Sequence, residues 1–330
     1  MTRDLTVGTT TTLMSDCYDR KPLRVAFLGN SMQFTNDSPR LMEQMFAAAN
    51  AGASSSCQRV FEQDSCLRSG ADISSLWWEG TNVFLFFRHT LDWGADYPED
   101  LLSDSKWDFV VINDNTQWPA RADSRAESLR TLELEYVPLL KQNKITPIFL
   151  MTPAYKKPCI EGSGDLGDFD YYTHLLADGY INYYKKQMDF WLQTSVGDSR
   201  DASANLTSRV APIGLAYQQL RRSNMNLWEK LYDHDEYHPS YHGTLLQAYV
   251  LYITLTGETP PNNYSPTWWD TSRYDPLLGF DKPLPIPTQQ EARQLRQAAI
   301  QVMQTDDGTL AVSIDAVPEQ PKSPMRIVCP

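Results

Sequence analysis

The sequence predicts an α/β protein, a three-layer α/β/α sandwich around a mainly parallel sheet of about five strands. Short, strongly apolar runs alternate along the chain with longer amphipathic stretches, the pattern of a parallel α/β sheet. The runs expected to form strands are residues 23–28, about 58–63, 109–112, 147–151 and 210–213. A further short strand is expected at 310–314.

Helical patterning separates these strands. The first helix is expected to take Ser38 as its N-cap and Pro39 as its first residue, and to run to Gly52. Pro138 is expected to kink a later helix, and Gly257 to end the last amphipathic helix of the core. The other helices are expected at about 76–78, 124–142, 171–194, 214–221, 240–256 and 288–304.

Composition divides the chain into three parts. Residues 1–20 are polar and Thr-rich and have no apolar core like that of a signal peptide, so we expect a flexible leader. Residues 21–257 are expected to form the α/β domain. Residues 258–330 are expected to be a C-terminal extension that wraps the same domain. The chain is 42% hydrophobic, enough to bury a core.

Charge restricts the function. The net charge of −12 repels phosphate backbones and anionic membranes, so nucleic acid is an unlikely partner class. No apolar run is long enough for a transmembrane helix. The partner class expected is a small molecule, and the location expected is the cytoplasm because no signal peptide is visible. Export stays open if the N-terminus is incomplete, and the oligomeric state stays open too.

Five cysteines are present, at positions 17, 57, 66, 159 and 329. None forms a C-x-x-C pair, so a zinc or thioredoxin-like motif is not indicated. Without a visible export signal, free thiols are the default expectation. A Cys57–Cys66 bridge is the alternative for an exported protein.

Polar groups follow the ends of two expected strands. Ser31 in Gly29-Asn30-Ser31 comes after the first strand and before a helix, and Asn113-Asp114-Asn115 follows a later one. Ligands bind at the carboxyl ends of strands in open parallel sheets. A serine there has its hydroxyl in the cleft, and an asparagine amide can donate to a developing oxyanion. Taken singly, each motif is weak, and a polar turn is the favoured explanation of the asparagines alone.

The turn at 235–239 adds a base. Asp235 and His238 are three residues apart, which lets the carboxylate accept a hydrogen bond from Nδ1 while Nε2 points elsewhere. That is the geometry of a general base that deprotonates a serine. An alternative is a zinc site, because His234, His238 and His242 are spaced by four. Pro239 argues against one continuous helix through them.

Together these motifs resemble the ordered blocks of the SGNH (GDSL-type) hydrolase superfamily. RVAFLGNSMQFTNDSPRLMEQM resembles the nucleophile block of a bacterial-type subgroup with GNSF-like starts. WDFVVINDNTQWPA resembles its third block. VAPIGLAYQQLR and LYDHDEYHPSYHGTLLQAYVLYITLTG resemble its C-terminal block. The resemblance covers residues 21–257 and implies the flavodoxin-like fold of that superfamily.

The resemblance also implies a function, that of a serine esterase that hydrolyses an ester through an acyl-enzyme, with carbohydrate and short-chain acyl esters as candidate substrates. It implies no cofactor and no metal. Ser31 is then the nucleophile, His238 the base and Asp235 the residue that orients it. The implied oxyanion hole uses the Ser31 and Gly70 backbone N–H groups and an asparagine side chain, Asn115 first and Asn113 second.

The sequence departs from the family's motif pattern in two places, and two alternative functions remain open. The first block has GNS where many members have GDS, and the third has INDNTQ without the usual glycine, which leaves the oxyanion asparagine ambiguous. Gly197-Asp198-Ser199 spells GDS but follows a long helix, so we expect a surface loop. An acyltransferase with the same residues and a non-catalytic ligand-binding relative are the alternative functions. The substrate is not indicated.

Overall fold

A computed structural model describes residues 21–51, 53, 57–82, 95–104, 106–194, 206–262 and 285–304. Its centre is a five-stranded sheet in the order β2-β1-β3-β4-β5, with every neighbouring pair parallel. The strands are β1 (Leu23–Gly29), β2 (Phe61–Leu67), β3 (Phe109–Ile112), β4 (Thr146–Leu150) and β5 (Arg209–Ala211). This is the strand order of flavodoxin-like folds, and it confirms the predicted sheet.

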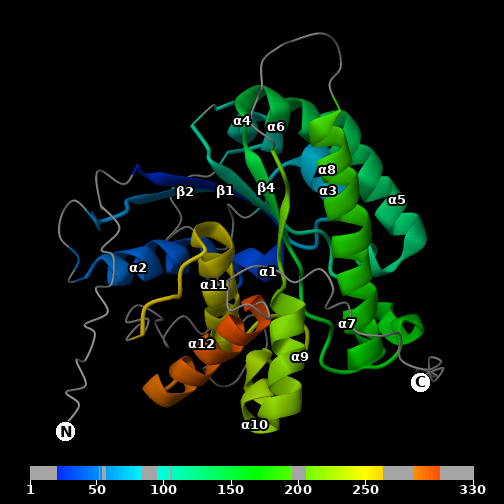
Figure 1. The fold of residues 1–330 in the computed structure, drawn as a ribbon. Coiled ribbons are helices and arrows are strands. Elements are labelled where there is room, and N and C mark those ends of the chain that lie inside the picture. The colour runs from blue at the N-terminus through cyan, green and yellow to red at the C-terminus, as the bar shows by residue number, and fades with distance from the viewer. Residues whose placement is uncertain are drawn as a thin grey trace, which may run out of the picture.

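Helices cover both faces of the sheet, as Figure 1 shows. One layer holds α2 (Ser38–Asn50), α9 (Ile213–Ser223), α11 (Tyr241–Thr256) and α12 (Gln289–Met303). The other holds α3 (Ile73–Glu79), α4 (Pro98–Ser103), α5 (Ala122–Thr131), α6 (Val137–Asn143) and α8 (Lys186–Gln193). Shorter or end-placed helices are α1 (Ser31–Phe34), α7 (Phe169–Ala177) and α10 (Met225–Trp228). The predicted three-layer α/β/α architecture is confirmed.

The core explains why α11 is so apolar. Val25 to Leu28 of β1 are fully buried, as expected of a strand covered on both faces. Every residue from His242 to Leu255 in α11 is also buried, because α2, α9, α12 and β5 surround this helix. The helix therefore fixes the position of the turn that precedes it.

Three helix predictions need correction. Asp37, not Ser38, is the N-cap of α2, because Asp37 adopts a left-handed conformation and its carboxylate accepts the Arg40 N–H. The helix expected at 124–142 is not α-helical throughout. A π-helical segment, Leu132–Tyr136, lies just before Pro138, and this wider turn accommodates a residue without an N–H. The helix expected at 171–194 likewise contains a π-helical segment, Asp178–Lys185, between α7 and α8.

The cysteine expectation is also wrong in part. Cys57 and Cys159 are disulfide-bonded, whereas Cys66 is a free, fully buried thiol. The Cys57–Cys66 alternative is therefore excluded. Burial raises the pKa of the Cys66 thiol to about 12, and the nearby Asp96 carboxylate adds to the shift. Cysteine spacing carries no information on which thiols meet in space, and that is why the sequence missed this.

Some expectations fall outside the described residues. They concern the leader at 1–20, the GDS string at 197–199 and the strand at 310–314. Within the C-terminal part, α12 packs on α11 and α9. No helix in the described ranges is long and apolar enough to cross a membrane.

Candidate active site

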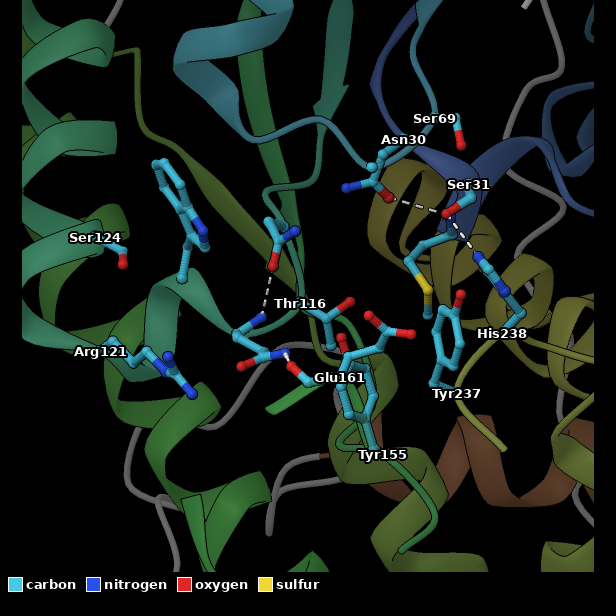
Figure 2. A pocket seen from close by; sticks show the side chains of 15 residues that line it. Asn30, Ser31, Ser69, Thr116, Arg121, Ser124, Tyr155, Glu161, Tyr237 and His238 are labelled. Carbon is cyan, nitrogen blue, oxygen red and sulfur yellow. Dashed lines mark hydrogen bonds between the residues drawn. The ribbon is translucent and has the colours of Figure 1, made fainter. Parts of the chain in front are cut away.

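A pocket of about 360 Å³ lies at the carboxyl edge of the sheet, beyond the ends of β1, β2 and β3. Its size is that of a small-molecule site. Polar side chains dominate its lining, and Figure 2 shows them converging from several segments. The lining residues singled out by the sequence are Ser31, Gly70, Asn115 and His238.

The turn that presents Ser31 depends on Gly29. This residue ends β1 with a φ of 155°, a backbone conformation that L side chains rarely adopt. A Cβ at Gly29 would also lie only 1.9 Å from Asn113 Oδ1. The chain therefore turns sharply into α1, whose first residue is Ser31.

The buried Asn30 side chain holds this turn in place through hydrogen bonds. Its side-chain oxygen accepts the Met32 N–H at 3.1 Å and so caps α1. Its amide group donates to the carbonyl oxygens of Ala71 at 2.7 Å and Asp114 at 3.1 Å. One buried amide thus holds together the segments that follow β1, β2 and β3. An aspartate there would place a carboxylate against two carbonyl oxygens, so the geometry favours an amide at this position.

The His238 turn is equally well defined. The Asp233 N–H donates to the His238 carbonyl at 2.9 Å, and Tyr232 forms an antiparallel bridge with Pro239. Asp235 Oδ1 accepts the backbone N–H groups of Tyr237 at 3.1 Å and His238 at 3.0 Å. The carboxylate therefore organises the turn as well as facing the imidazole.

Ser31, His238 and Asp235 form one hydrogen-bonded line, of which Figure 2 shows the bond between Ser31 and His238. The Ser31 Oγ lies 2.7 Å from His238 Nε2, and His238 Nδ1 lies 2.6 Å from Asp235 Oδ2. Burial disfavours the charge on Asp235, but hydrogen bonds and the charge of His238 outweigh it and lower the pKa of this carboxyl. Asp235 is thus an ionised acceptor, and in the tautomer that carries a proton on Nδ1 the imidazole can accept the Ser31 proton at Nε2.

A second link ties the two motifs together. The Asn36 amide donates to the Pro239 carbonyl oxygen at 2.8 Å and to Thr244 Oγ1 at 2.9 Å. Asn36 lies in the loop after the expected nucleophile, and Pro239 directly follows His238. The positions of Ser31 and His238 therefore depend on the Asn36 hydrogen bonds as well as on the hydrogen bond between the two residues.

The two candidate oxyanion asparagines occupy different places. Asn115 and Gly70 both line the pocket beside Ser31. Asn115 Oδ1 accepts the Gln117 N–H at 3.1 Å, which leaves its amide group for a ligand. Asn113 is buried beneath the site instead, where its Oδ1 accepts the Gln33 amide at 2.6 Å and its amide donates to Asn30 Oδ1 at 2.8 Å.

Asp114, between them, was not predicted to matter. Its fully buried carboxylate accepts bonds from four donors, the Ile73 and Asn115 N–H groups and the Ser128 and Tyr184 hydroxyls. Burial still outweighs these donors and raises the pKa of Asp114 to about 6. Its partners come from α3, α5 and the π-helical segment before α8, so sequence spacing gave no signal.

The histidines of the zinc alternative do not converge. His234 is exposed, His238 faces Ser31, and His242 is buried in α11 with its Nε2 3.4 Å from Glu291 Oε2. In the described part of the chain, no group of three or more His, Cys, Asp or Glu side chains is placed to hold a metal ion.

Further lining residues were missed by sequence reasoning. Trp118 and Arg121 come from the segment between Asn115 and α5, and Tyr155 and Glu161 from the loop after β4. The Gln117-Trp118-Pro119 string just after the asparagine motif is a signal that could have identified Trp118 and Arg121, because residues following a strand end at this edge border the pocket. Tyr155 and Glu161 gave no such signal.

Comparisons with known proteins bear on the fold alone. No protein-family model and no curated protein matches the sequence. A DUF4886 family protein from Bacteroides uniformis has a similar structure, with a TM-score of 0.58 and 14% identity, covering 87% of this chain and 97% of that one. A provisionally assigned SGNH hydrolase from Slackia heliotrinireducens aligns with a TM-score of 0.46 and 19% identity, covering 71% of this chain and 99% of that one. The first likeness supports the fold, and the second is too weak to carry an argument.

Proposed function

We propose that the protein is a serine esterase of the SGNH type, with Ser31 as nucleophile, His238 as general base and Asp235 as the residue that orients it. One observation carries this proposal, the continuous line from Ser31 Oγ through the imidazole to Asp235 Oδ2, with distances of 2.7 and 2.6 Å. A serine is a weak nucleophile until an adjacent base accepts its proton, and this line supplies that base.

The reaction proceeds in two halves. Ser31 Oγ attacks the ester carbonyl while His238 Nε2 takes its proton, and the imidazolium then protonates the leaving alcohol as the acyl-enzyme forms. Water, deprotonated by His238, attacks the acyl-enzyme and releases the acid. The tetrahedral oxyanion is stabilised by the Ser31 and Gly70 backbone N–H groups and the Asn115 amide. Asn115 is preferred to Asn113 because it lines the pocket and Asn113 does not.

Hydrolysis of p-nitrophenyl acetate tests the proposal. Ser31→Ala is expected to lower kcat by at least about a thousandfold. Ser69→Ala is the matched control, since Ser69 lines the same pocket without contacting the imidazole, and it is expected to keep most of the activity. A fluorophosphonate probe is expected to label the peptide that contains Ser31 and no other. Equal activity of wild type and Ser31→Ala would overturn the assignment.

A further inference from the structure

The three donors of the proposed oxyanion hole lie on separate segments. Ser31 begins α1, Gly70 lies in the loop between β2 and α3 (residues 68–72, here named the Gly70 loop), and Asn115 follows β3. Among the described residues, neither the Gly70 N–H nor the Asn115 amide group has a hydrogen-bond partner, so both are available to an oxyanion. Such donors are effective only when the protein holds them in place beforehand. The spacing between Gly70 and Asn115 therefore needs a physical cause.

One buried carboxylate oxygen joins two of these segments. Asp114 Oδ1 accepts the Asn115 N–H at 2.8 Å and the Ile73 N–H at 3.0 Å. The first bond fixes the backbone of the residue whose amide group faces the pocket. The second fixes the first residue of α3, directly after the Gly70 loop. Asp114 itself is fully buried and does not line the pocket, so it acts on the donors without contacting a ligand.

The remaining bonds of Asp114 keep this oxygen in one place. Its Oδ2 accepts the hydroxyl groups of Ser128 at 2.7 Å and Tyr184 at 2.5 Å, which holds the carboxylate plane in one orientation. Its main-chain carbonyl oxygen accepts the Asn30 amide at 3.1 Å, and the same amide donates to the Ala71 carbonyl at 2.7 Å. The side chain and main chain of Asp114 thus join the segments that follow β1, β2 and β3.

What Asp114 supplies to the hole is an acceptor oxygen and not a charge. A negative charge repels a developing oxyanion, and burial already disfavours the ionised form of Asp114, whose pKa it raises to about 6. An amide oxygen in the same place accepts the same two N–H groups. The role therefore predicts that asparagine can replace Asp114 and that a side chain without such an acceptor cannot.

We propose that Asp114 is the positioning residue of the oxyanion hole, which holds the Asn115 amide and the Gly70 loop at the spacing that a tetrahedral oxyanion requires. This inference rests on the proposed esterase function and adds to it a residue that touches neither the substrate nor the triad. Removal of the Oδ1 acceptor is expected to weaken binding of the transition state but not of the substrate, because the oxyanion exists only in the transition state.

Two esters that differ only in the carbonyl atom test this role. p-Nitrophenyl acetate forms a tetrahedral oxyanion, whereas O-p-nitrophenyl thionoacetate places a sulfur anion there, and sulfur is a weak hydrogen-bond acceptor. The ratio of kcat/KM for the oxygen ester to that for the thionoester therefore reports on the oxyanion donors. The intrinsic reactivities of the two esters cancel when variants are compared. Asp114→Ala is expected to lower kcat for p-nitrophenyl acetate by about tenfold to a hundredfold, with KM little changed, and to lower the ratio by about tenfold.

Three further variants complete the experiment, with rates taken per folded molecule. Asp114→Asn is expected to restore kcat and the ratio to near their wild-type values. Asp114→Thr is measured beside Asp114→Ala in case the latter does not fold, and the same loss is expected, because the threonine hydroxyl lies one bond too close to the backbone to reach the Ile73 N–H. Asp189→Ala is the matched control, since it removes a carboxylate that accepts the Ser208 N–H outside the pocket, and it is expected to keep the ratio.

The wild-type rate separates failure of the positioning role from failure of the esterase proposal. An unchanged ratio in Asp114→Ala or Asp114→Thr overturns the positioning role while the esterase proposal stands. A ratio that falls as far in Asp114→Asn as in Asp114→Ala also overturns it, because the charge and not the acceptor oxygen is then what the site needs. Absence of ester hydrolysis by wild type overturns the esterase proposal and the positioning role with it.

Discussion

The side-chain amide of Asn36 donates a hydrogen bond to the Pro239 carbonyl oxygen at 2.8 Å. This bond joins the loop that follows Ser31 to the turn that carries His238, across 203 positions of sequence. The distance between serine and imidazole therefore depends on a residue that touches neither. In the proposed mechanism Asn36 is a positioning residue.

Asn36→Ala is expected to lower kcat for p-nitrophenyl acetate by about tenfold to a hundredfold, because small displacements of reacting groups are costly. KM is expected to change much less, since Asn36 does not line the pocket. Asn182→Ala is the matched control, because that amide bonds only to Asp178 within one helix among the described residues. A kcat equal to wild type in Asn36→Ala would contradict the positioning role.

Asp235→Asn is expected to lower kcat by about a thousandfold to ten thousandfold. The asparagine oxygen can still accept the Tyr237 and His238 backbone N–H groups, so the turn is retained. The amide nitrogen cannot accept the Nδ1 proton, so the imidazole takes the wrong tautomer. Steady-state kinetics measure the effect, and Asp233→Asn in the same turn serves as the control. A loss below about tenfold would show that His238 is oriented by other contacts.

Asn30→Asp is expected to lower the free energy of unfolding by about 2–3 kcal/mol at neutral pH. The substitution removes both donors to the Ala71 and Asp114 carbonyls and places a carboxylate beside them. Urea unfolding measures the loss. Asn224→Asp is the control, because Asn224 caps α10 as an acceptor and aspartate does so equally well. Unchanged stability of Asn30→Asp would mean that its amide bonds contribute little.

Asp114 predicts a pH dependence of stability. The pKa of Asp114 is about 6 in the folded protein, whereas the ordinary value of 3.8 applies to the unfolded chain. Between these two pH values the folded state therefore binds more protons than the unfolded state. Stability contributed by Asp114 is therefore greatest at low pH and falls as pH rises from about 4 to about 6, by roughly 3 kcal/mol in all.

Asp114→Asn removes this titration while an amide oxygen still accepts the Ile73 and Asn115 N–H groups. Unfolding free energies of wild type and variant, measured at several pH values, are expected to diverge in favour of the variant as pH rises through this window. A difference that stays constant with pH would show that Asp114 titrates at its ordinary pKa.

The sequence predicted β1, β3, β4 and β5 well because these strands are short and apolar. It placed β2 about three residues too early, because the polar run Glu62-Gln63-Asp64 hides this strand. The order of its motifs also predicted that Ser31, Asp235 and His238 share one site. It could not choose between Asn113 and Asn115. They are two positions apart, and only the tertiary partners Asn30 and Gln33 show that Asn113 points into the protein.

Other features depend on partners that are distant in sequence. Three of the four donors to Asp114, from Ile73, Ser128 and Tyr184, come from separate segments, and so do the Gly162 and Asp165 contacts of Arg121. The disulfide bonding of Cys57 and Cys159 was missed for the same reason. The π-helical segments were missed because a single inserted residue per turn barely changes apolar periodicity.

Ser31 and His238 lie 207 positions apart, one directly after the first strand and the other just before the last helix that packs on the sheet. A ribosome delivers the serine early and the imidazole only after most of the chain has emerged. A nascent chain that stops before His238 therefore carries a serine with no base beside it. Any cut or premature stop between Ser31 and His238 leaves a fragment that lacks one of the two. The reactivity of Ser31, where present, therefore reports that the chain is intact from Ser31 to His238.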